Sequence, residues 1–167
     1  MVGIVKNLIA IAVIGGIEHL FALYIRPLLY VDLFLLYTVY AGLLMQQVSA
    51  AYSGFLAGAL QDLLSGFPVG VNGFSKTILG FGIATVNRYM ILDSTWIRLG
   101  AVLAASLINS AVLAALLYTL EQSIPVHFFQ TSVIQATSNS MAALILFHIA
   151  DRVRRGGQKQ LAKPYAD

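Results

Sequence analysis

Cysteine is absent from the 167-residue chain, and charged residues make up only 10% of it. The absence of cysteine excludes disulfides, thiolate metal sites and cysteine nucleophiles. A soluble domain normally carries about 25% charged residues. Their scarcity here, with 59% hydrophobic residues and a mean hydropathy of +0.82, indicates an integral membrane protein without a second globular domain.

Sequence motifs of common enzyme classes are missing as well. There is no HExxH zinc motif, and the stretch from Gly70 to Gly73 lacks the Lys-Ser/Thr pair of a phosphate-binding loop. Ser53 lies outside the GxSG pattern of an intramembrane serine protease, and no histidine is placed to activate it. The three histidines lie on separate segments without metal-ligand spacing. We therefore expect a protein that is not an enzyme, with no catalytic residues, metal or cofactor.

Six apolar segments cover most of the chain, at residues 4–24, 28–46, 50–64, 74–92, 96–120 and 128–150. Most approach the ~20 residues that a helix needs to cross a bilayer, whereas the third is shorter. The sequence predicts an all-α membrane protein, folded as a compact six-transmembrane-helix bundle over residues 1–150. Residues 151–167 are expected to form a short, flexible, basic tail on the anionic cytoplasmic leaflet.

Basic residues are distributed unevenly between the two ends of these predicted spans. With both termini in the cytoplasm, eight of the ten Lys and Arg residues lie inside and only Arg26 and Lys76 lie outside. This bias predicts a multi-pass protein with both termini cytoplasmic. The clustering at one end does not suggest nucleic acid as a partner. Three arginines at the start of the tail are the candidates for contact with lipid or a cytoplasmic protein: Arg152, Arg154 and Arg155.

The stretch from Ala50 to Lys76 carries the strongest local pattern. Small residues and one acid recur every four positions along one helix face: Ala50, Gly54, Gly58, Asp62 and Gly66. Small residues at this spacing let two helix backbones approach closely in lipid, either within the bundle or with a partner. A structured turn is then predicted from four residues that follow closely: Gly66, Pro68, Gly70 and Gly73.

Asp62 has two compatible interpretations. Its carboxylate could accept hydrogen bonds from backbone N–H groups freed by the turn, which would be an architectural role. It could also organise an outward-facing surface for a partner.

Replacement of Gly58 by Leu is expected to overpack the small-residue contact and so to destabilise it by about 1 kcal/mol or more.

Weaker patterns lie elsewhere along the chain. Ala12 and Gly16 repeat the four-residue spacing in the first segment, and Thr131, Gln135 and Asn139 predict a polar seam in the sixth. Eight ionisable residues lie in or near the apolar segments: Glu18, His19, Arg26, Asp32, Asp62, Lys76, Arg88 and His148. Pairing among them, or contact with interfacial water, is favoured over an ion path, because a relay normally needs several acids deeper in the bilayer. Few deep polar groups are expected in the chain as a whole, which favours a protein that holds partners over one that binds a small molecule.

The run GFLAGALQDLLSGFPVGVNGFSKTILGF resembles the rod shape-determining protein MreD family of bacterial inner-membrane proteins. That family's central pattern is a Gly-rich helix, an Asp, a Gly-x-Pro-x-Gly turn and another apolar helix. Six residues of this chain occupy those places: Gly54, Gly58, Asp62, Gly66, Pro68 and Gly70. The resemblance implies a helix-packing or partner-binding role for these six residues.

The same resemblance implies a non-enzymatic scaffold of the cell-elongation (rod) machinery in the bacterial cytoplasmic (inner) membrane. MreC is the expected direct partner, with MreB, RodA, a transpeptidase penicillin-binding protein and membrane lipid as further candidates. Such a scaffold would help control cell shape and lateral peptidoglycan synthesis.

An alternative function follows from the fold that the family is thought to share with the S components of energy-coupling-factor transporters. This chain would then bind a small molecule, such as a vitamin, as part of a transporter. Asp32, Asn72, Lys76 and Gln135 would be expected to converge on an outward cavity.

Overall fold

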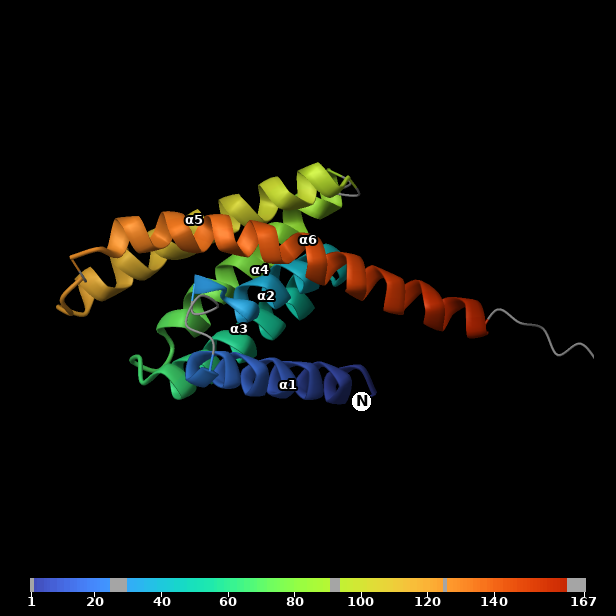
Figure 1. Ribbon diagram of the computed structural model, residues 1–167, viewed down its shortest axis with the longest axis horizontal. Helices are drawn as coiled ribbons and strands as arrows, with labels where there is room; N and C mark the ends of the chain where they lie inside the picture. Colours follow the sequence, from blue (N-terminus) through green and yellow to red (C-terminus); the bar gives the residue numbers. More distant parts are fainter. Residues whose placement is uncertain (1, 25–29, 91–93, 125, 162–167) are drawn as a thin grey trace, which may run out of the picture.

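The computed structural model describes residues 2–24, 30–90, 94–124 and 126–161, which contain α-helices and no strand. Six helices follow one another there: α1 (Val2–Tyr24), α2 (Leu33–Leu44), α3 (Gln47–Ser65), α4 (Val71–Tyr89), α5 (Thr95–Thr119) and α6 (Phe128–Leu161). The prediction of an all-α fold is confirmed for this part of the chain. The N-terminus and the C-terminal end of α6 lie toward the same end of the bundle (Figure 1).

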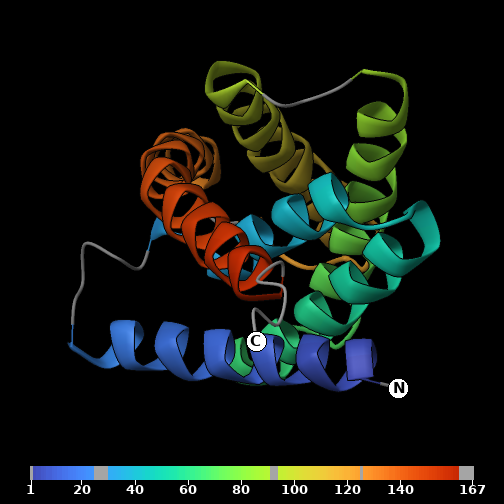
Figure 2. The same ribbon diagram turned by 90° about the vertical axis from the view of Figure 1, so that its right-hand side faces the viewer.

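The short helix α2 is the centre of the bundle and touches all five other helices (Figure 2). Its 12 residues span about 18 Å, so it is shorter than the segment 28–46 predicted from hydropathy. The helix begins where the Asp32 carboxylate accepts a hydrogen bond of 2.7 Å from the Leu35 N–H. It ends at Met45, whose backbone is extended.

Apolar packing surrounds α2 on two sides. On one side, Leu35, Leu36 and Val39 pack with residues of α4, α5 and α6. On the other, Phe34 packs with Ile11 of α1 and Ala57 of α3. A helix that is apolar all round is stable only when other elements cover it, so the sequence of α2 accounts for its central place.

Helices α5 and α6 carry the membrane-spanning signal of the described residues. Two stretches there are long and apolar enough to cross a bilayer, Thr95–Thr119 and Phe128–Ile149. At most 28% of each apolar stretch is buried in the bundle. Their large exposed side chains, among them Leu107, Ile108 and Ile145, are therefore available to lipid.

Helix α6 continues without a break to Leu161. The first part of the predicted tail, residues 151–161, is therefore helical. Residues 162–167 lie outside the described part of the chain. Arg, Gln, Lys and Leu, which dominate residues 151–161, favour helix, and the next proline is Pro164. The 34 residues of α6 span about 51 Å, so its C-terminal part extends beyond the other helices (Figure 1).

Candidate functional site: a glycine seam and a buried polar network

Helices α3 and α4 form the most extensive helix pair of the bundle, and glycines determine how closely they approach. A Cβ atom at Gly54 would overlap the backbone carbonyl of Lys76, and one at Gly58 would overlap that of Asn72. From the facing helix, a Cβ atom at Gly80 would overlap the carbonyl of Ala50. No side chain fits at these three positions without moving a backbone, which is the packing that small residues permit in lipid.

Asp62 lies one helical turn after Gly58 and is fully buried. Its carboxylate accepts hydrogen bonds from the backbone N–H groups of Gly70 (2.8 Å), Asn72 (3.1 Å) and Gly73 (3.3 Å). The Asn72 side-chain amide donates a fourth, also at 2.8 Å. These donors belong to the turn and to the first residues of α4, whose N–H groups have no partner within the helix. A carboxylate there also interacts favourably with the helix dipole.

The turn that brings these donors to Asp62 depends on two backbone conformations. Gly66 ends α3 with φ of 70° and Gly70 precedes α4 with φ of 104°, both in the left-handed region that favours glycine. Pro68 lies between them and accepts a hydrogen bond at its carbonyl from the Val71 N–H. The side chains of Pro68 and its neighbours are exposed, so this turn is a surface feature above a buried acid.

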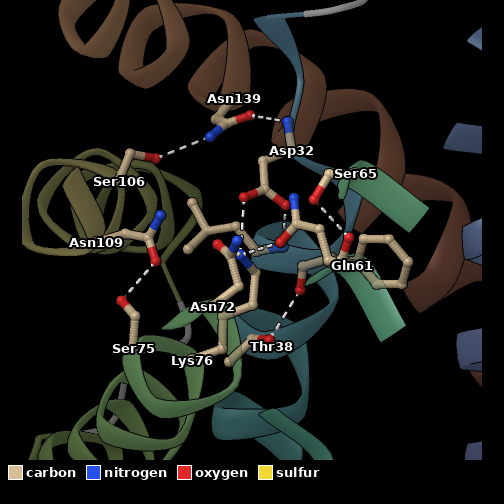
Figure 3. A network of polar contacts seen from close by, with 12 residues as sticks. Asp32, Thr38, Gln61, Ser65, Asn72, Ser75, Lys76, Ser106, Asn109 and Asn139 are labelled. Atoms are coloured by element: carbon tan, nitrogen blue, oxygen red, sulfur yellow. Dashed lines mark hydrogen bonds and ion pairs between the residues drawn. The ribbon is translucent and has the colours of Figure 1, made fainter. Parts of the chain in front are cut away.

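Lys76 is the largest charged side chain in the interior. Its Nζ lies 2.9 Å from Asp32 Oδ2, and the two side chains are 0% and 2% exposed. It also donates to Gln61 Oε1 (2.5 Å) and Asn72 Oδ1 (3.3 Å). An ammonium group has three donors, and here each one has an acceptor (Figure 3).

Lys76 lies on α4 inside the bundle, paired with Asp32, which confirms the predicted pairing among the ionisable residues of the apolar segments. The side of the membrane expected for Lys76 stays a prediction. Burying an ammonium ion is costly unless it is paired and hydrogen-bonded. Asp32, Gln61 and Asn72 meet that requirement.

The network continues from Asp32 to α5 and α6. The Asp32 N–H donates to Asn139 Oδ1 at 2.8 Å, and Asn139 Nδ2 donates to Ser106 Oγ at 3.0 Å (Figure 3). A separate bond of 2.7 Å joins Ser75 of α4 to Asn109 of α5. Polar side chains therefore connect the helices that the apolar core also joins.

The expectation of few deep polar groups is wrong. Twelve polar or charged side chains of the described residues are buried: Asp32, Thr38, Ser53, Asp62, Asn72, Ser75, Lys76, Ser106, Asn109, Ser110, Ser132 and Asn139. The predicted seam on α6 is correct only in part. Asn139 is buried and Gln135 is half-buried, whereas Thr131 is exposed and donates to its own helix at the His127 carbonyl.

Polar contacts also attach α1 to the rest of the bundle. Asn7 donates to Ser53 Oγ at 2.8 Å and accepts a hydrogen bond from the Tyr37 hydroxyl. Further along α1, Glu18 Oε1 accepts from Gln61 Nε2 at 3.4 Å. The side-chain amide of Gln61 thus donates to Glu18 and accepts from Lys76, which joins α1 to the Lys76 network.

Sequence reasoning placed Gly54, Gly58 and Asp62 on one face, and the structure brings them together along α4. It predicted pairing among the ionisable residues and a polar seam with Asn139, but it did not identify Asp32 and Lys76 as the partners, and it missed Gln61. Arg152 is exposed on α6, far along the chain from this network. The side chains of Arg154 and Arg155 lie outside those that the structure describes.

The groups around Lys76 and Asp62 are fixed by hydrogen bonds to one another. Glu18 differs, because its Oε2 atom is buried and has no hydrogen-bond partner among the described residues. No group of three or more His, Asp or Glu side chains able to hold a metal occurs in the ranges that the structure covers. Asp32, Asn72 and Lys76 were expected to line a ligand cavity in the transporter interpretation. They bind one another instead, and Gln135 makes no hydrogen bond to them in the described structure.

The described part of the chain is thus a helical bundle with two helices able to span a membrane and with Asp32, Asp62 and Lys76 held inside by neighbouring polar groups. A family model described as rod shape-determining protein MreD matches residues 2–151. The chain therefore belongs to the MreD family, a family of membrane proteins that acts in rod shape determination. No match was found among curated proteins or among solved structures.

Proposed function

We propose that this protein is a non-enzymatic, multi-pass scaffold of the rod machinery in the bacterial inner membrane, with both termini cytoplasmic and with MreC as its direct partner. Membership of the MreD family supports a role in shape determination. Through MreC, the scaffold would help position RodA, a transpeptidase penicillin-binding protein and MreB, and so influence lateral peptidoglycan synthesis.

The observation that carries the proposal is the polar network around Lys76, in which every donor of the ammonium group already has an acceptor within the protein. Asp32, Gln61 and Asn72 accept hydrogen bonds from the ammonium group of Lys76. The Asp62 carboxylate accepts a hydrogen bond from a backbone N–H group at the start of α4. A binder of polar small molecules needs polar groups aimed into a cavity. Polar groups that bond to one another suit a rigid body that presents its outer faces to other helices. The network around Lys76 therefore favours the scaffold over the vitamin-binding S component.

Partner binding in lipid would use the outer apolar faces, where close packing rather than the hydrophobic effect drives helix association. Because Gly54 and Gly58 already pack against α4, we assign them to the internal seam and leave partner contact to exposed side chains. Arg152, Arg154 and Arg155 would contact anionic lipid or MreB at the cytoplasmic side.

The test is a mild-detergent pull-down of the tagged protein from a rod-shaped bacterium, with mass spectrometry of everything retained. Recovery of MreC, absent from the same experiment with an unrelated tagged membrane protein, is the expected result. Recovery of an ATPase pair with a coupling membrane subunit, or of a bound vitamin, would establish the transporter function instead.

A second arm of the experiment tests the arginines. Replacing Arg152, Arg154 and Arg155 by Gln should reduce MreB recovery or membrane-surface contact while MreC recovery stays unchanged. Lys6→Gln, at an exposed residue of α1, is the matched charge control. Unaltered localisation and co-purification in the triple variant would remove this part of the proposal.

A further inference from the structure

A cavity of about 510 Å³ lies where α2 ends, α3 begins and α4 ends. Eight residues line it: Leu44, Met45, Gln46, Gln47, Val48, Ala84, Asn87 and Arg88. It belongs to the end of the bundle that faces the viewer in Figure 2, where the N-terminus also lies. The Lys76 network is a separate site, since none of its residues lines this cavity.

Hydrogen bonds hold the walls of this cavity in place. Gln47 Nε2 donates to Thr85 Oγ1 at 3.0 Å, which joins α3 to α4. Asn87 Nδ2 donates to the Leu43 carbonyl at 2.9 Å, which joins α4 to the end of α2. Both amides are therefore fixed before any ligand arrives, which lowers the entropic cost of binding.

Charge in the cavity has one sign. Among the described residues that line the cavity, Arg88 is the charged one, and no acidic side chain accompanies it. The guanidinium is exposed and takes part in no ion pair among the described residues. Nor is there an acidic residue in the first turn of α3, which starts at this cavity. A planar guanidinium matches the paired oxygens of a phosphate group.

Besides Arg88 and the amides Gln46, Gln47 and Asn87, the lining is apolar, and most of these apolar side chains are exposed. Leu44, Met45 and Val48 are 40%, 37% and 77% exposed. Tyr89, directly after Arg88, is 79% exposed, as is typical of an aromatic residue at a membrane–water interface. An apolar wall next to a cation at such a level suits a molecule with a phosphate head and an acyl chain.

We propose that this cavity binds the phosphate-bearing headgroup of an anionic phospholipid, with Arg88 as its cation. The guanidinium pairs with the phosphate, and the side chains of Leu44, Met45 and Val48 contact the glycerol and the first methylenes of the acyl chains. This places a specific lipid where α2 ends and α3 begins, independent of whether MreC is the partner.

The experiment is native mass spectrometry of the purified, detergent-solubilised full chain titrated with phosphatidylglycerol or phosphatidylcholine. We expect one tightly bound phosphatidylglycerol per chain and weaker phosphatidylcholine binding. Arg88→Gln should weaken phosphatidylglycerol binding about tenfold, because a charge-assisted hydrogen bond is lost. Lys6→Gln removes an exposed cation that does not line the cavity and should leave the affinity unchanged.

A second variant, Val48→Glu, tests the same cavity if Arg88→Gln fails to fold. Val48→Glu places an acid in the first turn of α3, where it is compatible with the helix, and should compete with phosphate for Arg88. Equal affinity for both lipids, or equal losses in Arg88→Gln and Lys6→Gln, would overturn the proposal. Displacement of the lipid by millimolar glycerol 3-phosphate would overturn the choice of a lipid over a soluble phosphate.

Discussion

Asp32 and Lys76, 44 positions apart in the sequence, form an ion pair of 2.9 Å that is sealed inside the bundle. The pair joins the start of the central helix α2 to the middle of α4. Each partner has further bonds, since Asp32 Oδ1 caps α2 and Lys76 also binds Gln61 and Asn72. The removal of one partner would therefore leave a buried charge without its counterion.

Lys76→Met is expected to destabilise the protein by about 3–5 kcal/mol, because the Asp32 carboxylate would remain buried and unpaired. Adding Asp32→Asn should recover part of the loss, since Asn also caps a helix and carries no charge. Thermal unfolding in detergent measures both. Lys6→Met, at an exposed position, should change little. A double variant no more stable than Lys76→Met would contradict the ion-pair explanation.

Local features of the site could be predicted from sequence, whereas long-range pairings could not. The turn between α3 and α4 and the hydrogen-bonding role open to Asp62 depend on residues within eleven positions of one another. Pairing of Lys76 with another ionisable residue could be predicted, but its partner could not. The position of Lys76 depends on Asp32, and no local pattern records that partner.

Four-residue spacing identifies a face of a helix but not what covers that face. Ala12 and Gly16 have the same spacing as Gly54 and Gly58, yet both are exposed. Gly15 is instead the packed glycine of α1, against Leu60, Leu64 and Phe34. The length of α2 was overestimated for a related reason: hydropathy marks apolar residues whether or not they are helical.

Asp62→Asn is expected to destabilise the bundle by about 1–3 kcal/mol, since one acceptor oxygen is replaced by an amide that faces N–H donors. The loss of stability should be concentrated at the start of α4. Hydrogen exchange by mass spectrometry should show faster exchange in a peptide covering residues 66–76 than in α5. Ser65→Ala, which removes a bond within α3 alone, is the control. Equal exchange in Asp62→Asn and the parent protein would exclude the capping role.

Asn139→Ala removes the hydrogen bonds from α6 to the Asp32 N–H and to the Ser106 hydroxyl. The free energy of unfolding should fall by about 1–3 kcal/mol, because both groups stay buried without that partner. Ser140→Ala, next along the same helix, removes only a bond to the Ala136 carbonyl. It should therefore have a much smaller effect. Denaturant unfolding of both variants in one detergent gives the comparison, and equal stability would show that the Asn139 bonds are not structural.

Gly58→Ala tests the glycine seam with a single added methyl group, because that Cβ would overlap the Asn72 carbonyl and force α3 and α4 apart. Overpacking of this kind costs about 1–3 kcal/mol. Gly16→Ala is the matched control, since a Cβ there has nothing within 4 Å. It should be neutral or slightly stabilising, because alanine favours helix over glycine. Thermal unfolding in detergent should separate the two variants clearly.

If Gly58→Ala melts at no lower temperature than Gly16→Ala, the helices have room for a side chain at Gly58. The four-residue spacing would then not indicate close approach of α3 and α4. If Gly58→Leu then also leaves partner recovery unchanged, the seam has no role in the scaffold.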